Sequence, residues 1–148
     1  MSELQCTLYP FGTKTPLRFV AVCSFFQGKY LLSRHKERTT WETQGGHIEQ
    51  GETAMGAAVR ELFEESGASG TLYPLCDYKG YIGERFAYGA VFLADIKEIG
   101  SLPESEMAEA KLFDTLPKEL TYPYMTPVFF EEAKRLAEKL DMIKKDEL

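Results

Sequence analysis

The hydrophobic positions of the chain fall into short runs that are rich in aromatic and β-branched residues and are separated by turn residues. Such runs predict β-strands, here over residues 18–26, 30–35, 71–81, 85–96 and 111–113. Gln27-Gly28-Lys29 separates the first two runs, and a short connection with glycine is typical of a hairpin. The sequence therefore predicts that the first two strands are antiparallel neighbours.

A different pattern over residues 54–66 predicts a helix. Thr53 is placed to cap its first turn, and Gly67 stands where a left-handed residue would end it. At about 100° per residue, the larger apolar residues gather on one side. The predicted buried face consists of Met55, Ala58, Val59, Leu62 and Phe63.

A second helix is predicted near the C-terminus, with Thr126 as N-cap and Pro127 as its first residue. Acidic residues follow early and basic residues late, as the helix dipole favours. A length of 148 residues and a hydrophobic content of 44% suit a single domain with a full core. Strands, a helix, more strands and a final helix predict an α/β fold with a mixed β-sheet between helices.

Three carboxylates of the first helix, Glu61, Glu64 and Glu65, fall within an arc of about 100°. Like charges at this spacing repel, so the arrangement favours a divalent cation or another compensating partner. A solvated acidic helix face is the alternative. The Gly45-Gly46 pair favours the cation, because a tight glycine loop lets the backbone approach a metal or ligand closely.

The segment from Gly46 to Ala68 reads GHIEQGETAMGAAVRELFEESGA. Its glycines, its acids and the Arg60-Glu61-Leu62 run stand at the spacing of the Nudix signature, and the segment closely resembles the MutT-like Nudix hydrolase family. One position departs, because Ala68 replaces the usual aliphatic residue. The resemblance implies a Nudix-type α/β/α sandwich, with residues 1–148 as one domain. It also implies hydrolysis of a nucleoside diphosphate linked to another group, with Mg²⁺ or Mn²⁺ holding the diphosphate.

The resemblance also assigns roles to single residues. The metal ligands would be the carbonyl of Gly45 and the carboxylates of Glu61, Glu64 and Glu65. The catalytic group would comprise Arg60, Glu61, Glu64 and, from outside the signature, Glu106. Arg60 is expected to orient a glutamate, and Glu52 to tie the loop to the helix. The alternative for Arg60 and Glu52 is an ordinary surface charge.

A carboxylate outside the signature commonly supplies the catalytic base or a further ligand in related enzymes. The acidic run Glu104, Glu106 and Glu109 precedes the predicted strand at 111–113, and within it Glu106 or Glu109 is favoured. A solvated acidic loop is the alternative for either residue.

Substrate contacts are predicted from charged and aromatic residues. Lys36, Arg38 and Arg85 are candidates for binding phosphates, with a purely solubilising role as the alternative. The chain contains no asparagine, so the asparagine that reads oxidised guanine in one branch of the family has no counterpart. A nucleobase could instead stack on Tyr122, Tyr124 or Phe86, although aromatic residues in such places also serve the core.

The leading hypothesis is a metal-dependent pyrophosphohydrolase that cleaves a nucleoside triphosphate or a related compound by attack of water on phosphorus. The alternatives are a nucleotide-sugar or dinucleotide pyrophosphatase and a non-catalytic nucleotide sensor, although the intact signature acids argue against a sensor. A net charge of −6 gives no support to hydrolysis of RNA 5′ ends or to nucleic acid as a partner. The sequence does not decide between a monomer and a homodimer.

No apolar run is long enough to cross a bilayer, and no secretory signal precedes the first strand, so a cytoplasmic protein is expected. The last four residues, Lys145 to Leu148, match an endoplasmic-reticulum retrieval signal, which we interpret as coincidence. The three cysteines are widely separated and predict neither a zinc site nor a disulfide framework. Cys23 lies in an apolar run and is expected in the core.

Overall fold

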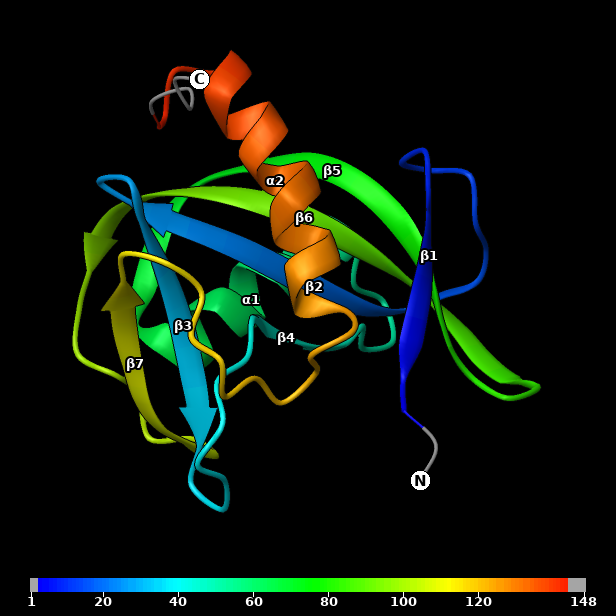
Figure 1. The fold of residues 1–148 in the computed structure, drawn as a ribbon, viewed down its shortest axis with the longest axis horizontal. Helices are drawn as coiled ribbons and strands as arrows, with labels where there is room; N and C mark the ends of the chain where they lie inside the picture. Colours follow the sequence, from blue (N-terminus) through cyan, green and yellow to red (C-terminus); the bar gives the residue numbers. More distant parts are fainter. Residues whose placement is uncertain (1–2, 144–148) are drawn as a thin grey trace.

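The computed structural model describes residues 3–143 of the chain. Within these residues, seven strands form one sheet and two helices pack against it (Figure 1). The strands are β1 (Gln5–Tyr9), β2 (Leu17–Phe26), β3 (Lys29–His35), β4 (Gln44–His47), β5 (Ala68–Ile82), β6 (Arg85–Ile99) and β7 (Met107–Phe113). The helices are α1 (Ala54–Ser66), between β4 and β5, and α2 (Thr126–Lys139), after β7.

The sheet is mixed, with the strand order β1-β5-β6-β2-β3-β7. β2 and β6 run parallel, and the other paired strands are antiparallel. On the side away from β6, β2 pairs first with β4, through residues 19–22, and then with β3, through residues 24–26. The sheet therefore divides at β2, and β4 carries the glycine pair along the first half of that strand.

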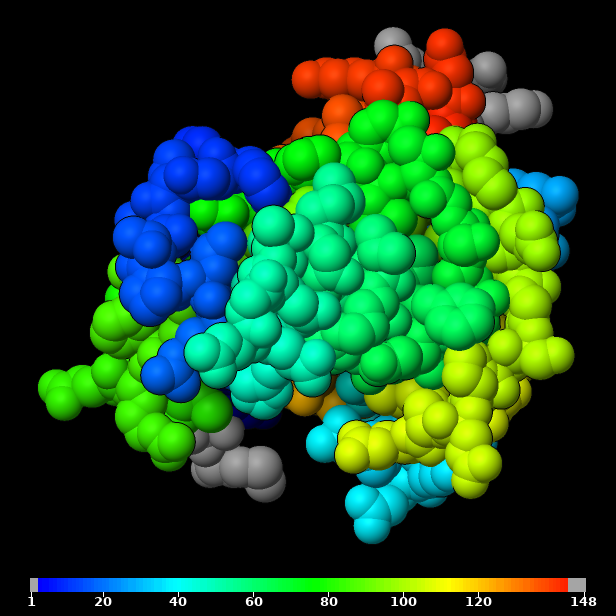
Figure 2. Space-filling view, turned by 180° about the vertical axis from the view of Figure 1, so that it is seen from behind, coloured from blue at the N-terminus to red at the C-terminus, as the bar shows by residue number. Residues whose placement is uncertain are grey.

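The two helices cover opposite faces of the sheet, with α2 in front and α1 behind in Figure 1. Figure 2, seen from the other side, shows α1 over the middle of its face. β2 alternates accordingly: Ala21, Cys23 and Phe25 belong to the core under α2, and Val20 and Val22 to the core under α1. The predicted α/β/α sandwich is confirmed, as is the core position of Cys23.

The five predicted strands are all present, each somewhat longer than predicted. The predicted hairpin between β2 and β3 is also confirmed. Its turn residues Gln27 and Gly28 both have positive φ, 53° and 82°. Positive φ at both positions is what a two-residue turn between twisted antiparallel strands requires.

Two strands, β1 and β4, differ from the prediction. The pattern does not predict β1 at all, and the glycine pair predicted as a tight loop belongs instead to β4. Gly45 and Gly46 pair with Ala21 and Val20 of β2. A Cβ at Gly45 would collide with the Val20 carbonyl, so the missing side chain permits this pairing.

The strand β7 also begins earlier than predicted, at Met107 rather than at residue 111. Glu109 therefore lies within a strand, and only Glu104 and Glu106 of the predicted acidic loop precede it. The pairing with β3 explains the extension, because Arg34 stands opposite Glu109 in the register.

The buried side of α1 differs from the predicted one. The buried residues of the helix are Ala57, Ala58, Leu62 and Ser66. Val59 and Phe63 are 51% and 53% exposed, and Met55 is 36% exposed, so the prediction is wrong for these three. Small side chains let the helix lie close to the sheet, and this close approach selects the alanine side rather than the bulkier one.

The start of α2 also differs. The N-cap is Met125, which makes no side-chain capping bond, and Thr126 is the first helical residue instead of the cap. Thr126 is 2% exposed, so its side chain is buried rather than placed over the free amides of the first turn. Pro127 lies in the first turn as predicted.

None of the helices among the described residues is long and apolar enough to cross a membrane. The C-terminal Lys145 to Leu148 segment lies outside the described residues.

The side of α1 that packs on the sheet can be tested by a matched pair of substitutions. Leu62→Ala is expected to lower the free energy of unfolding by about 2–5 kcal/mol, because it removes a buried side chain and leaves a cavity. Val59→Ala, on the exposed side, is expected to change it by no more than about 0.5 kcal/mol. Urea denaturation of the two variants measures both values. A larger loss for Val59→Ala than for Leu62→Ala would restore the face predicted from the sequence.

Candidate active site

The ends of α1 are fixed by local chemistry that the sequence predicts correctly. Thr53 accepts a hydrogen bond from the Gly56 N–H at 3.0 Å and caps the N-terminus. Gly67 ends the helix in the left-handed region, with φ at 74°. With both ends set, the acidic residues of α1 are presented to β4.

Two of the predicted metal ligands reach the glycine pair of β4. The carboxylate of Glu65 accepts a hydrogen bond from the Gly45 N–H at 2.8 Å. The carboxylate of Glu61 lies against Gly46, so closely that a Cβ there would collide with it. Both carboxylates therefore lie against successive residues of one strand, and glycine is what leaves room for them.

Both of these carboxylates are partly removed from water. Burial, helped by the nearby carboxylates of Glu61 and Glu42 and opposed by the Gly45 N–H, raises the pKa of Glu65 to about 8. Burial also raises the pKa of Glu61. Such shifts are typical of buried carboxylates whose negative charge lacks a compensating cation.

Arg60 joins the loop before α1 to the helix. Its guanidinium donates to both oxygens of Glu52, at 2.7 and 2.8 Å, and to the His47 carbonyl at 3.1 Å. The hydrogen bonds from Arg60 lower the pKa of Glu52 to about 2. Glu64 and Glu61 lie 3.4 and 3.5 Å from the same guanidinium. Arg60 thus contacts signature glutamates, and its bond with Glu52 ties the loop to the helix.

The donor set suits a hard divalent cation. The predicted ligands at Gly45, Glu61, Glu64 and Glu65 are all oxygen atoms, the type that Mg²⁺ and Mn²⁺ prefer. Among residues 3–143, no three His, Cys, Asp or Glu side chains already surround one point closely enough to hold an ion. The partly buried charges of Glu61 and Glu65 would be stabilised by a cation, so these residues fit one.

Glu42 is a buried carboxylate beside the site that the sequence interpretation does not identify. It is 9% exposed, and one of its oxygens accepts hydrogen bonds from Arg38 at 3.1 Å and Thr121 at 3.0 Å. Its charge also contributes to the raised pKa of Glu65. The one signal in the sequence is its position, three residues before Gly45.

The predicted acids outside the signature are paired with β3. Glu109 lies 3.2 Å from Arg34, and Glu106 lies 3.5 Å from the imidazole of His35. The side chain of Glu106 is 86% exposed. The structure gives no contact between these two acids and the signature glutamates.

A cleft of about 580 Å³ lies next to this acidic region. It is bounded by residues of β2, β4, β5, β6 and the start of α2. Its polar lining includes Arg18, Glu42, Gly45, Gly46, His47, Tyr78, Arg85, Tyr122 and Thr126. Its apolar lining includes Phe19, Phe86, Met125 and Phe129. The cleft therefore combines the glycine pair of the acidic site with aromatic walls, as small-molecule sites commonly do.

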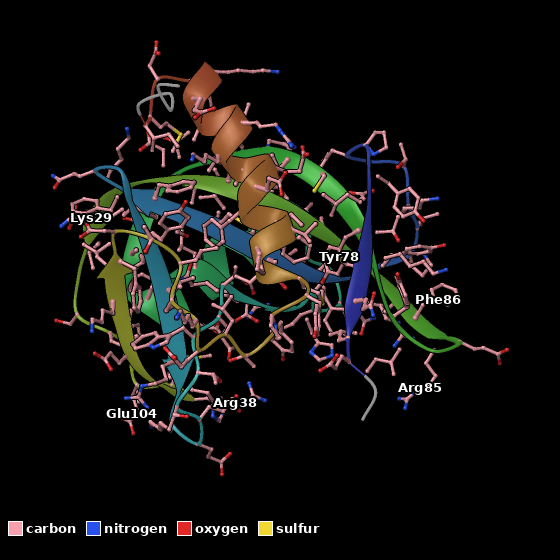
Figure 3. All side chains as sticks on the ribbon, in the orientation of Figure 1. Lys29, Arg38, Tyr78, Arg85, Phe86 and Glu104 are labelled. Atoms are coloured by element: carbon pink, nitrogen blue, oxygen red, sulfur yellow. The ribbon has the colours of Figure 1, made fainter. Side chains whose placement is uncertain are left out.

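The three predicted phosphate-binding residues differ in their position relative to the cleft. Arg85 lines it, whereas Lys36 and Arg38 are not among its lining residues. Figure 3 shows Arg38 at one end of the molecule and Arg85, with Phe86, at another. Arg38 is engaged with Glu42, as described above. Of the predicted stacking residues, Tyr122 and Phe86 line the cleft and Tyr124 does not.

Arg18, which sequence reasoning missed, is a second cation of the cleft. Within residues 3–143, the guanidinium groups of Arg18 and Arg85 make no hydrogen bond or ion pair with another side chain. Unpaired cations on a cleft wall suit an anionic ligand.

Comparison with known proteins identifies the class of enzyme to which the chain belongs. The family described as NUDIX domain matches residues 15–126, which include the glycine pair, α1 and all residues that line the cleft except Leu4 and Phe129. The chain belongs to the Nudix family and is a Nudix hydrolase, a pyrophosphohydrolase by class.

Two relatives come from Bacillus subtilis (strain 168). The chain is 34% identical to "Putative 8-oxo-dGTP diphosphatase YtkD" over 111 residues, 72% of this chain and 68% of the relative. It is 41% identical to a second "Putative 8-oxo-dGTP diphosphatase" over 54 residues, 36% of each chain.

Solved structures agree with the fold. The Bacillus subtilis pyrophosphohydrolase BsRppH (E68A mutant) superimposes with a TM-score of 0.74 and 27% identity, over 91% of this chain and 92% of that one. A MutT Nudix hydrolase from Burkholderia pseudomallei gives 0.64 and 24%, over 80% of this chain and 98% of that one.

The contact between Glu61 and Gly46 predicts the effect of one added methyl group. Gly46→Ala is expected to keep the fold but to displace the flexible end of Glu61, since that carboxylate occupies the space of the new Cβ. The Kd for Mn²⁺, followed by the loss of its free electron-paramagnetic-resonance signal, should rise by about tenfold or more. Gly100→Ala is the control, because a Cβ there makes only ordinary contact. An unchanged Kd in Gly46→Ala would contradict this role for Glu61.

Proposed function

We propose that the chain is a metal-dependent pyrophosphohydrolase that acts on nucleoside triphosphates. The observation that carries this proposal is the position of the Glu61 and Glu65 carboxylates against the glycine pair, because that pair also lines a cleft with unpaired arginines. Acids that bind a cation and arginines that bind phosphate together suit a polyphosphate substrate. Aromatic walls in the same cleft suit a nucleobase.

In this proposal Gly45, Glu61, Glu64 and Glu65 hold Mg²⁺ or Mn²⁺. When bound, such an ion polarises a phosphate oxygen and offsets the negative charge of substrate and glutamates. The chain's own residues position the reactants: Arg18 and Arg85 bind phosphate oxygens, and Arg60 keeps the loop and Glu64 in place. Water attacks phosphorus, the anhydride bond breaks, and Glu106 is the candidate outside the signature for taking the water proton.

The relatives support a nucleotide as substrate. YtkD, 34% identical to this chain, carries the name of an 8-oxo-dGTP diphosphatase, so oxidised and ordinary purine triphosphates are the first compounds to test. The chain lacks the asparagine that one branch of the family uses for the oxidised base, so any such preference would need other residues. Nucleotide sugars and dinucleotides are the alternative within the same reaction.

A substrate panel tests the proposal. The panel contains deoxynucleoside triphosphates, 8-oxo-dGTP, nucleotide sugars and dinucleoside polyphosphates, each with Mg²⁺ and Mn²⁺, and released pyrophosphate and monophosphate are measured. Triphosphates are expected to be the best substrates. Turnover confined to nucleotide sugars or dinucleotides would replace the proposed substrate, and nucleotide binding without any product would replace the enzyme with a sensor.

Glu65→Gln is expected to lower kcat by about two orders of magnitude or more, because a neutral amide is a poor ligand for a hard cation. The amide oxygen can still accept the hydrogen bond from Gly45, so the melting temperature should not fall. Glu131→Gln is the matched control, since Glu131 is exposed on α2 and pairs there with Arg135. Full turnover in Glu65→Gln would remove Glu65 from the reaction.

Arg85 lines the cleft and Lys36 does not, so substitutions of these two predicted phosphate-binding residues should differ in their effect on KM. Arg85→Ala is expected to raise KM about three- to tenfold through the loss of a charged hydrogen bond at a partly exposed site. Lys36→Ala removes an equal charge outside the cleft and should leave KM close to the wild-type value. Steady-state kinetics at fixed Mg²⁺ measure both. A larger effect of Lys36→Ala would move the phosphate site to the loop before β4.

A further inference from the structure

Tyr78 of β5 is held rigidly at the cleft. It stands opposite Gly89 of β6 in the register, and a Cβ at Gly89 would collide with the Tyr78 ring and its hydroxyl. On the other side the ring packs against Phe129 of α2, with 4.9 Å between ring centroids. Figure 3 shows Tyr78 between the start of α2 and β1. The ring therefore lies between strand backbone and helix, with little freedom to move.

The hydroxyl of Tyr78 has no hydrogen-bond partner among the described residues. Tyr78 is 6% exposed, and its oxygen makes no hydrogen bond with another of residues 3–143. Thr126, at the start of α2, is 2% exposed, and its hydroxyl is likewise unpaired within the described chain. Both residues line the cleft.

These two hydroxyls are not sealed inside the protein. Among the described residues, the side-chain oxygen that is closed off from solvent and lacks a partner is Oδ1 of Asp77, on the other face of β5. The Tyr78 and Thr126 oxygens are therefore reached by solvent, and both residues line the cleft. A hydroxyl that solvent can reach is free to exchange water for a hydrogen bond to a ligand.

Packing alone does not account for a tyrosine at this place. Phenylalanine would fill the same space against Gly89 and Phe129, as the neighbouring aromatic side chains do, without leaving an unpaired oxygen. Burial also raises the pKa of the Tyr78 phenol, so the group keeps its proton at neutral pH and can donate it in a hydrogen bond.

We propose that the Tyr78 hydroxyl, together with that of Thr126, is the polar contact through which the cleft recognises the base of a bound nucleotide. This inference rests on the proposed nucleotide substrate. The surroundings favour the base over the phosphates, because Phe129 and Met125 are apolar and a buried neutral hydroxyl suits a neutral heterocycle better than a multiply charged group. The unpaired charges of Arg18 and Arg85 serve the phosphates.

Tyr78→Phe tests this contact, since it removes one oxygen and keeps the ring. We would measure the Kd of the four deoxynucleoside triphosphates and of inorganic tripolyphosphate by calorimetry with Mg²⁺. The Glu65→Gln protein, expected to bind without turnover, serves as the common background. In Tyr78→Phe the Kd of the preferred nucleotide should rise about three- to tenfold, as for one lost hydrogen bond. The spread of Kd among the four bases should narrow, and the Kd of tripolyphosphate, which has no base, should not change.

Tyr30→Phe is the matched control. Tyr30 packs on Phe25 and Phe130 in the same core but does not line the cleft, so its variant should bind every ligand like the background protein. An unchanged Kd and base preference in Tyr78→Phe would overturn the inference. An equal rise for tripolyphosphate would also overturn it, because the effect would then be structural.

The same experiment separates this inference from the proposed function. Base-dependent loss of binding in Tyr78→Phe, combined with no turnover by the wild-type protein, would support the contact and reject the enzyme. Turnover by the wild-type protein, combined with unchanged binding in Tyr78→Phe, would support the enzyme and reject the contact. A protein that binds none of the four nucleotides overturns the inference.

Discussion

The hydrogen bond from the Gly45 N–H to the Glu65 carboxylate, at 2.8 Å, joins α1 to β4 at the centre of the site. Two conditions make it possible. The helix must lie close to the sheet, which the fully buried Ala57 and Ala58 allow. The strand must also present bare backbone, which the glycine pair supplies. The position of the acidic side chains therefore follows from small residues on both partners and not from the acids themselves.

This arrangement is unfavourable for a protein that binds no cation. Burial raises the pKa of Glu65 to about 8, so its charged form is less stable here than in water. Arg60, the residue before Glu61, is already bonded to Glu52 on both carboxylate oxygens and reaches Glu61 only at 3.5 Å. A protein that holds two partly buried acids beside a strand loses stability, and such local losses are common at functional sites.

Sequence patterns predict the parts of this structure that depend on neighbours in the chain. The caps at Thr53 and Gly67 are correct because each depends on a few successive residues. The apolar face of α1 is wrong for Val59 and Phe63, because helical periodicity shows which residues share a side but not which side approaches the sheet. The strand β4 is missed for a similar reason: a glycine pair forms a strand only because β2 lies beside it.

The candidate site likewise has one part that depends on neighbours in the chain and another that depends on the folded sheet. The acids lie on 23 successive residues, from Gly46 to Ala68, and their spacing on one helix suffices to predict a cation-binding stripe. The cleft is assembled from β2, β4, β5, β6 and the start of α2, and the register of these strands places each of its residues. Tyr78 meets Gly89 only through the pairing of β5 with β6. A sequence alone can therefore predict the class of reaction, because the signature that identifies the class is local. It cannot predict the substrate in the same way, because the residues that line the cleft come together only in the folded sheet.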